Sequence, residues 1–332
     1  MAFFRGIPVS LWGSGMYVPE KVLTNDDLSK LVETSDEWIR DRTGIQRRHI
    51  AAEGELTSTV AEKAARAALD DAGVDPSELD MIIVATNSPD TLFPGVAPKV
   101  QGLLGAQNAG AFDVQSGCTS GVYSMAVAAG GIASGMWKRV LVIGAEVLSP
   151  LIDWTDRNTC VLFGDGAGAV VLGPSREGEG KFISAELRSD GTKHEQITLP
   201  GGVVQHPATA ETVKNKLHYV AMKGNDVFKF VNRTIPPFLR DYCGASGFSP
   251  EDIDWWFFHQ ANQRIIERSA ERLGISPDKV ILNIAEYGNT SAASLFIALS
   301  EFLREKRLRK GEKLLFTAFG AGMTYGGILY EA

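Results

Sequence analysis

The segments GVDPSELDMIIVAT (residues 73–86) and GFSPEDIDWWFFH (residues 247–259) decide the architecture of this chain. They align without a gap at an offset of 174 residues, because 247 − 73 = 174. Each begins with a glycine and a proline-containing turn and ends in a run of apolar residues. That order is typical of a chain that leaves a helix, turns and continues into a buried β-strand.

Two further pairs of segments repeat in the same order. GCTSGVYSMA, which begins at Gly117, aligns with GNTSAASLFI, which begins at Gly288, at an offset of 288 − 117 = 171 residues. RVLVI from Arg139 aligns with KLLFT from Lys313 at 313 − 139 = 174 residues. Three ordered matches at nearly one offset indicate an internal duplication.

Each copy alternates short apolar strands with helices, which predicts βαβ units with buried, mostly parallel strands. The polar, turn-rich segment 173–180 separates the copies. We therefore predict an α/β fold whose two pseudo-symmetric halves, residues 1–174 and residues 175–332, pack into a five-layered αβαβα core.

Two segments need a separate explanation. Residues 189–222 have little periodicity and interrupt the second half, so we expect a functional loop near a site there. Gly164-Asp-Gly-Ala-Gly168 looks like a phosphate loop but lacks the GxGxxG spacing and a following Lys-Ser/Thr. For that motif we predict close backbone packing.

Composition excludes several classes of protein. The 332 residues are 44% hydrophobic and 22% charged, an ordinary globular mixture, and a net charge of −7 argues against nucleic-acid binding. Residues 1–20 lack a signal-peptide pattern. The uncharged segment Val114–Trp137 is too rich in glycine, alanine and serine for a lipid-spanning helix, so we predict a buried helix and no membrane association. Three widely spaced cysteines without a CxxC pair indicate the reducing cytoplasm, with no disulfide and no metal site.

The duplication also points to a site, because equivalent strand ends and helix starts of two related halves lie close together. Cys118 and Asn289 are equivalent residues, each after a glycine and before Thr-Ser, and His259 stands where the first half has Ala85. A cysteine at a helix start experiences the positive end of the helix dipole, which lowers the thiol pKa and favours the thiolate. A core thiol and a satisfied core histidine are the structural alternatives, and the duplicated motif favours a site.

Three blocks of sequence resemble a known family: DVQSGCTSG from Asp113, FHQAN from Phe258 and YGNTSAAS from Tyr287. They are similar to the Cys, His and Asn blocks of 3-oxoacyl-acyl-carrier-protein synthase III, in the thiolase-like superfamily. The similarity runs over about residues 7–331. The resemblance implies a thiolase-like fold and a homodimer. The Cys-His-Asn set differs from the Cys-His-His set of the longer elongating synthases and from thiolases, which use a second cysteine.

Carried over to this sequence, the resemblance implies a role for each block residue. Cys118 accepts the acyl group, while His259 and Asn289 hold the malonyl thioester carbonyl and stabilise the enolate. The backbone amides of Cys118 and Ala321 form the oxyanion hole for acyl transfer. Ala321 stands where the family usually has a glycine, and only its amide is needed.

The resemblance also implies positions for coenzyme A and the acyl chain. Trp38 and Arg157 enclose the adenine, and Phe93 closes the acyl pocket of the partner subunit. The pantetheine tunnel is lined by Arg42, Asn262 and Phe319. Without the resemblance, Trp38 is equally well explained as an amphipathic surface residue and Phe93 as ordinary core packing.

Acyl carrier protein is strongly acidic, and the family docks it near the helices that flank the His259 strand. Lys229, Arg264 and Arg268 are the contacts that the resemblance implies, and Arg264 matches best. Glu271 stands at one position where the family has a lysine. A solvated charged face is the structural alternative.

The function that the resemblance implies is the initiating condensation of type II fatty acid synthesis. Acyl-CoA and malonyl-acyl carrier protein give 3-oxoacyl-acyl carrier protein, carbon dioxide and free CoA, with no cofactor besides these substrates. The alternatives are an acyltransferase or condensing enzyme of secondary metabolism with a different acceptor, a papain-like hydrolase and a non-catalytic scaffold. Intact His259 and Asn289 favour condensation, and the duplication argues against the hydrolase. The length and branching of the primer acyl chain stay open.

Overall fold

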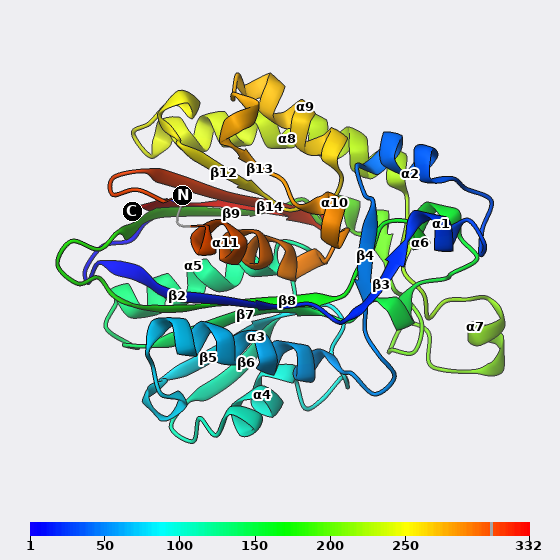
Figure 1. Ribbon diagram of the computed structural model, residues 1–332, viewed down its shortest axis with the longest axis horizontal. Coiled ribbons are helices and arrows are strands. Elements are labelled where there is room, and N and C mark those ends of the chain that lie inside the picture. The colour runs from blue at the N-terminus through cyan, green and yellow to red at the C-terminus, as the bar shows by residue number, and fades with distance from the viewer. Residues whose placement is uncertain (306–307) are drawn as a thin grey trace.

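Two β-sheets form the framework of the computed structural model, which describes residues 1–305 and 308–332 (Figure 1). The first sheet has five strands in the order β2-β8-β7-β5-β6. Their bounds are β2 (Val9–Tyr17), β5 (Met81–Ala85), β6 (Gly110–Val114), β7 (Val140–Glu146) and β8 (Gly166–Pro174). β5 runs parallel to β6 and β7, whereas β8 is antiparallel to both β7 and β2.

The second sheet repeats this order strand for strand as β9-β15-β14-β12-β13. The bounds are β9 (Lys181–Ser189), β12 (Trp255–Phe258), β13 (Val280–Ile281), β14 (Lys313–Gly320) and β15 (Thr324–Glu331). β12 is parallel to β13 and β14, and β15 is antiparallel to β14 and β9. A short N-terminal strand, β1 (Ala2–Phe3), pairs with β9. The matching order and directions confirm the internal duplication.

In the described residues, six of the longer helices complete the layers (Figure 1). The outer face of the first sheet is covered by α3 (Thr57–Ala72) and α4 (Val96–Leu104), and that of the second by α8 (Gly224–Ala245) and α9 (Gln263–Leu273). Between the sheets lie α5 (Ser120–Ala133) and α11 (Ser294–Arg304). The predicted five-layered αβαβα core is therefore confirmed.

The central position of α5 explains its uncharged sequence. Most of its residues are buried, with Val127 on its exposed edge. A Cβ added at Gly121 would stand 2.9 Å from the Phe296 ring and 3.0 Å from the Ala292 carbonyl oxygen. Glycine at this position therefore lets α5 and the start of α11 approach closely. The helix predicted in this region is a buried element of the core.

Parallel pairing is less extensive than the sequence pattern predicted. In each sheet it is confined to three strands, β5–β7 in the first and β12–β14 in the second. β15 returns beside β14 directly after the turn at residues 321–323. An antiparallel neighbour needs only a short turn, whereas a parallel one needs a crossover connection.

The Gly164–Gly168 motif packs beneath the site, as predicted. A Cβ added at Gly164 would stand 2.3 Å from the Tyr287 carbonyl oxygen of the second half. The buried Asp165 carboxylate accepts the backbone N–H of Leu148 at 2.7 Å. The motif therefore joins the two halves and fixes the chain at Leu148.

Smaller elements gather at one end of the layers (right side of Figure 1). They are β3 (Lys21–Thr24), α1 (Asn25–Leu28), α2 (Asp36–Thr43), β4 (Arg47–Ile50), α6 (Arg157–Cys160), β10 (Ile197–Thr198), α7 (Ala210–Lys214), β11 (Ala221–Met222) and α10 (Ile284–Tyr287). β10, α7 and β11 belong to the insertion at residues 189–222, which contributes to the cavity described below. No helix in the described part of the chain is long and apolar enough to cross a membrane.

Candidate active site

Cys118 lies in the turn between β6 and α5, just before the helix begins at Ser120. Burial raises the pKa of its thiol to about 12, while a hydrogen bond from Ser291 opposes this shift and the Glu146 carboxyl adds to it. This direction is opposite to the lowering that we expected at a helix start. The expectation was wrong because the sulfur is enclosed and the helix begins later than predicted. A thiolate at this position therefore needs local hydrogen-bond donors.

His259 follows β12 and is only 1% exposed. Its Nδ1 lies 2.7 Å from the Ser294 hydroxyl oxygen, which also accepts the Gln260 backbone N–H at 3.3 Å. The Ser294 hydrogen is therefore free to be donated to Nδ1, which leaves the proton of the neutral ring on Nε2. Burial lowers the pKa of His259 to about 3, so the ring is neutral at pH 7. The residue offers a neutral N–H donor rather than a charged one.

Asn289 is held on both sides by backbone hydrogen bonds. Its N–H donates to the Leu162 carbonyl at 2.9 Å, and its own carbonyl accepts the Gly164 N–H at 3.0 Å. The side-chain Oδ1 accepts the Ser291 backbone N–H at 2.8 Å. The Nδ2 group is thereby left as the donor of this side chain. Contrary to the predicted helix start, Asn289 precedes a single 3-10 turn, and α11 begins only at Ser294.

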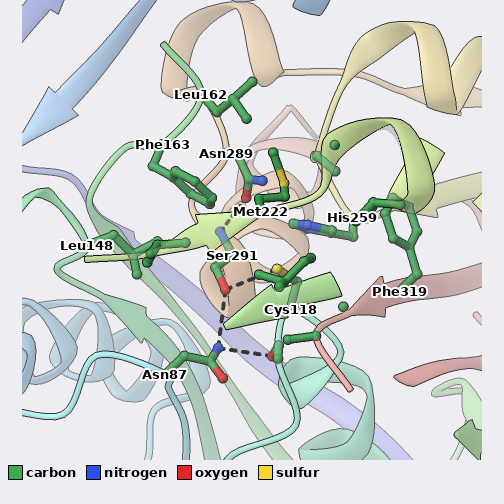
Figure 2. A pocket seen from close by; sticks show the side chains of 18 of the residues that line it. Asn87, Cys118, Leu148, Leu162, Phe163, Met222, His259, Asn289, Ser291 and Phe319 are labelled. Carbon is green, nitrogen blue, oxygen red and sulfur yellow. Dashed lines mark hydrogen bonds between the residues drawn. The ribbon is translucent and has the colours of Figure 1, made fainter. Parts of the chain in front are cut away.

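The structure brings these three residues to one cavity of about 360 Å³ (Figure 2). Cys118, His259 and Asn289 all contribute to its wall, together with Phe319, whose ring meets that of His259 edge-on at 5.6 Å. The apolar part of the wall includes Leu148, Leu151, Leu162 and Phe163 of the first half, Ile197, Leu199, Val220 and Met222 of the insertion, and Val227, Phe228 and Ile265 of α8 and α9. Figure 2 shows the apolar side chains of the first half on one side of the sulfur and His259 with Phe319 on the other.

Ala321 lies next to Cys118 through a close contact of two backbone segments. A Cβ added at Gly117 would stand 2.4 Å from the Ala321 nitrogen, and one added at Gly320 would stand 2.3 Å from the Cys118 nitrogen. Gly117 also has φ +59, in the left-handed region that favours glycine. Glycine at both positions therefore allows the amides of Cys118 and Ala321 to lie close together beside the sulfur.

The cavity continues outward into a wider groove. Asn262 contributes to both, and the groove is further lined by Arg42, Arg264 and Arg268. The Asn262 side chain donates from Nδ2 to the Arg42 carbonyl at 3.0 Å, and its Oδ1 caps the first turn of α9. This asparagine therefore joins α2 to α9 at the mouth of the cavity.

Trp38 lies apart from the inner cavity, on α2. The guanidinium carbons of Arg157 and Arg42 lie 5.0 Å and 5.4 Å from its ring centroid. Arg157 also donates from Nη1 to the Glu33 carbonyl at 2.9 Å. The three residues predicted to contact coenzyme A on this side thus form one cluster at the outer rim.

A basic groove runs between α8 and α9. It is lined by the cationic residues Lys229, Arg233, Arg240, Arg268 and Arg272. Phe228 contributes to this groove, to the wider groove and to the inner cavity, so the three hollows adjoin one another at this residue. Arg264 lies nearer the mouth, where its guanidinium pairs with Asp41 at 2.9 Å.

Phe93 does not reach the site within this chain. It lies on the loop between β5 and α4 and is 80% exposed, next to Leu92, which is 70% exposed. Its role in a partner's pocket therefore stays a prediction. Ordinary core packing, the structural alternative, is wrong for Phe93.

Four residues of the site were not predicted from the sequence: Asn87, Glu146, Ser291 and Ser294. Glu146 is fully buried at the end of β7, and burial raises the pKa of its carboxyl. Ser291 and Ser294 belong to the duplicated block that contains Asn289, which is the one sequence signal that could have indicated them. Within residues 1–305 and 308–332, no three His, Cys, Asp or Glu side chains are grouped to hold a metal ion.

A thiol next to two neutral N–H donors suits carbon–carbon bond formation between thioesters, because such donors stabilise an enolate oxygen. The duplicated five-layered fold is the one that thiolase-like condensing enzymes share, so the chain is a protein of that class.

Comparison with known proteins identifies the family. A family model described as 3-oxoacyl-[acyl-carrier-protein (ACP)] synthase III matches residues 112–191, and the model of its C-terminal part matches residues 243–332. The beta-ketoacyl-[acyl-carrier-protein] synthase III of Caldanaerobacter subterraneus subsp. tengcongensis is 49% identical over 319 residues, 96% of each chain. That of Desulfitobacterium hafniense is 47% identical over 325 residues, 98% of each chain. The crystal structure of 3-oxoacyl-[acyl-carrier-protein] synthase III from Aquifex aeolicus has a TM-score of 0.89 at 42% identity and covers 98% of this chain and 100% of that one. This chain belongs to the 3-oxoacyl-[acyl-carrier-protein] synthase III family.

Proposed function

We propose that the chain catalyses the initiating condensation of fatty acid synthesis, in which an acyl group from acyl-CoA is joined to malonyl-acyl carrier protein. The observation that carries this proposal is the meeting of Cys118, His259 and Asn289 in one cavity. The products are 3-oxoacyl-acyl carrier protein, carbon dioxide and free CoA. Both thioesters are substrates, so the reaction requires no resident cofactor.

In the loading step the Cys118 thiolate attacks the carbonyl carbon of acyl-CoA. The tetrahedral oxygen that forms is stabilised by the backbone N–H groups of Cys118 and Ala321, which lie close together beside the sulfur. The carbon–sulfur bond to CoA then breaks, and CoA takes up the proton that the thiol released. The acyl chain extends along the apolar side chains of Leu148, Leu162 and Phe163.

In the condensing step malonyl-acyl carrier protein loses carbon dioxide and becomes an enolate. Its oxygen accepts hydrogen bonds from His259 Nε2 and Asn289 Nδ2, both of which the surrounding residues leave free to donate. The enolate carbon attacks the acyl-Cys118 carbonyl, the bond to sulfur breaks and the thiolate is regenerated. A histidine whose pKa is about 3 is a poor general base, which disfavours acyl transfer to an alcohol or amine.

The surface around the entrance to the Cys118 cavity offers separate contacts for coenzyme A and for acyl carrier protein. The Trp38, Arg42 and Arg157 cluster at the outer rim offers a ring and two cations for the adenine and phosphates of coenzyme A, and Asn262 and Phe319 line the path inward. The basic groove with Lys229 and Arg268, and Arg264 nearer the mouth, provide positive charge for the acidic carrier protein.

We also assign a homodimer and a cytoplasmic location. β6 is the edge strand of its sheet, and the exposed apolar pair Leu92 and Phe93 lies on the neighbouring loop. An open sheet edge next to exposed apolar side chains favours pairing with a second copy. The free thiols of all three cysteines support the reducing compartment. Sedimentation equilibrium should give twice the chain mass, and a monomer at micromolar concentration would contradict the dimer.

The deciding experiment for the function follows the acyl group. Incubation with a short acyl-CoA should add one acyl mass, located on Cys118, and malonyl-acyl carrier protein should then remove it with release of carbon dioxide. Cys118→Ser should show neither step, because serine has no comparable thiolate at neutral pH. Cys160 and Cys243 are buried and serve as internal controls. Label on either of them, or acyl loading without carbon dioxide release, would refute the proposed reaction.

A further inference from the structure

Ser291 occupies a strained position at the centre of the site. It is 4% exposed, and its φ of +47° lies in the left-handed region, where residues other than glycine are uncommon. Its hydroxyl lies 3.3 Å from the Cys118 sulfur, and its backbone N–H donates to Asn289 Oδ1 at 2.8 Å. One residue thus contacts both the nucleophile and the asparagine of the enolate site (Figure 2).

Asn87 sets the direction of the Ser291 hydroxyl. Its Nδ2 group lies 3.2 Å from Ser291 Oγ and also contacts the Gly117 carbonyl at 3.0 Å and Glu146 Oε1 at 2.8 Å. An amide nitrogen only donates, so Ser291 Oγ is the acceptor in this contact, and the two Nδ2 hydrogens are shared among the three oxygens. The single hydroxyl hydrogen of Ser291 has two acceptors within reach, the Cys118 sulfur at 3.3 Å and the Glu146 carboxyl.

Glu146 fixes Asn87 in turn. Its carboxyl, with no exposed surface, accepts the Asn87 backbone N–H at 3.0 Å, the Ser88 hydroxyl at 2.6 Å and the Ala292 backbone N–H at 3.4 Å. The donors come from both halves of the chain. The carboxyl therefore locks the loop after β5 to the turn that contains Ser291.

We propose that Ser291 is a positioning residue that holds the Cys118 thiolate through its hydroxyl, with Asn87 and Glu146 fixing that hydroxyl from behind. The inference rests on the proposed role of Cys118 as nucleophile. Burial disfavours the thiolate, and α5 begins only after Cys118, so a fixed hydroxyl donor supplies stabilisation that the helix start alone does not. A merely structural role would act through the Ser291 backbone N–H or through the contacts of its hydroxyl with Asn87 and Glu146, and it would change the thermal stability rather than the reactivity of the thiol.

The test measures alkylation of Cys118 by iodoacetamide as a function of pH, because only the thiolate reacts. Ser291→Ala removes the hydroxyl and keeps the N–H contact with Asn289. Loss of a hydrogen bond to a charged group should move the rising limb of the rate–pH curve to higher pH by about one unit. Ser291→Gly should show the same shift, although it also removes the backbone strain. The two variants therefore differ in stability but share the loss of thiolate, which distinguishes the two effects. Thermal unfolding of each variant gives the stability.

Ser124→Ala is the matched control. Ser124 is also a buried serine, lies on α5 after Cys118, and its hydroxyl has no hydrogen-bond partner among the described residues. Its rate–pH curve should coincide with that of the unmodified chain. If both Ser291 variants also keep that curve, the inference is overturned. Alkylation requires no acyl-CoA, so this outcome leaves the proposed condensation untouched, whereas failure of acyl loading in the unmodified chain would refute the function itself.

Discussion

Asn289→Ala separates the two half-reactions, and the structure determines how large the separation should be. Ser291 N–H holds Asn289 Oδ1 at 2.8 Å, so Nδ2 is the group that donates to the enolate in the proposed mechanism. Removing one such donor typically costs ~3–4 kcal/mol, or about 10²–10³ in rate. Decarboxylation and condensation should fall by that factor, because the charge on the thioester oxygen develops in that step. Acyl loading of Cys118 uses other donors and should change by less than about threefold.

Asn289→Asp sharpens the same test. The substitution keeps the shape and the contact with the Ser291 N–H, but it replaces the donor with a carboxylate oxygen. A negative charge facing the developing enolate should reduce decarboxylation at least as much as the alanine variant does. Labelled acyl-CoA measures loading, and carbon dioxide release from the malonyl thioester measures the second step on the same sample. Equal losses in both steps would refute this division of labour, and no loss in either would make Asn289 a structural residue.

Two other predictions test the docking face and the neutral histidine. Arg264→Glu should raise the KM for malonyl-acyl carrier protein several-fold more than that for acyl-CoA, whereas Asp41→Asn, which frees Arg264 from its ion pair, should lower it. Arg176→Glu, another exposed surface charge, serves as the control, and equal effects on both substrates would exclude this docking face. The pKa of His259 is lowered to about 3, below its value of about 6.5 in the unfolded chain, so only the unfolded chain takes up this proton as the pH falls. The free energy of unfolding should therefore fall by up to about 1.4 kcal/mol per pH unit below pH 6.5, and His259→Gln should remove that part of the slope seen by chemical denaturation.

The duplication made the layers predictable from the sequence. Segments 73–86 and 247–259 each contain the strand that lies next to the edge of a sheet, β5 or β12. Two copies of one pattern must form two similar sheets, and their equivalent helices must share the space between them. The direction of each strand was harder to predict than the alternation of strands and helices, because an apolar run has the same composition whether the neighbouring strand is parallel or antiparallel. The antiparallel strands β8 and β15 were missed for this reason.

The hydrogen-bonded group of Asn87, Glu146 and Ser291 next to Cys118 could not be predicted from residue types. Glu146, Asn87 and Ser291 are separated by 59 and 204 residues along the chain and meet only because the two halves pack at that point. A glutamate at the end of an apolar strand gives no sign that Thr86, Asn87, Ser88 and Ala292 will donate to it. The pKa of Cys118 was predicted in the wrong direction for a related reason. The sequence indicates a nearby helix, but it does not show that Met222 and other residues of the insertion complete the wall of the cavity that Cys118 lines.

The two copies also explain why one site performs two steps. Equivalent positions have diverged, so that one copy supplies a sulfur at Cys118 where the other supplies an amide at Asn289. At the end of the equivalent strands one copy has Ala85 and the other His259. In the proposed mechanism the nucleophile therefore comes from the first half and both enolate donors come from the second. Ser291 and Ala321 are the exceptions, because these residues of the second half lie against Cys118. Substitutions at His259 or Asn289 should therefore reduce the rate of decarboxylation more than the rate of acyl loading. A substitution at Ser291 should instead mainly reduce the fraction of Cys118 that is thiolate.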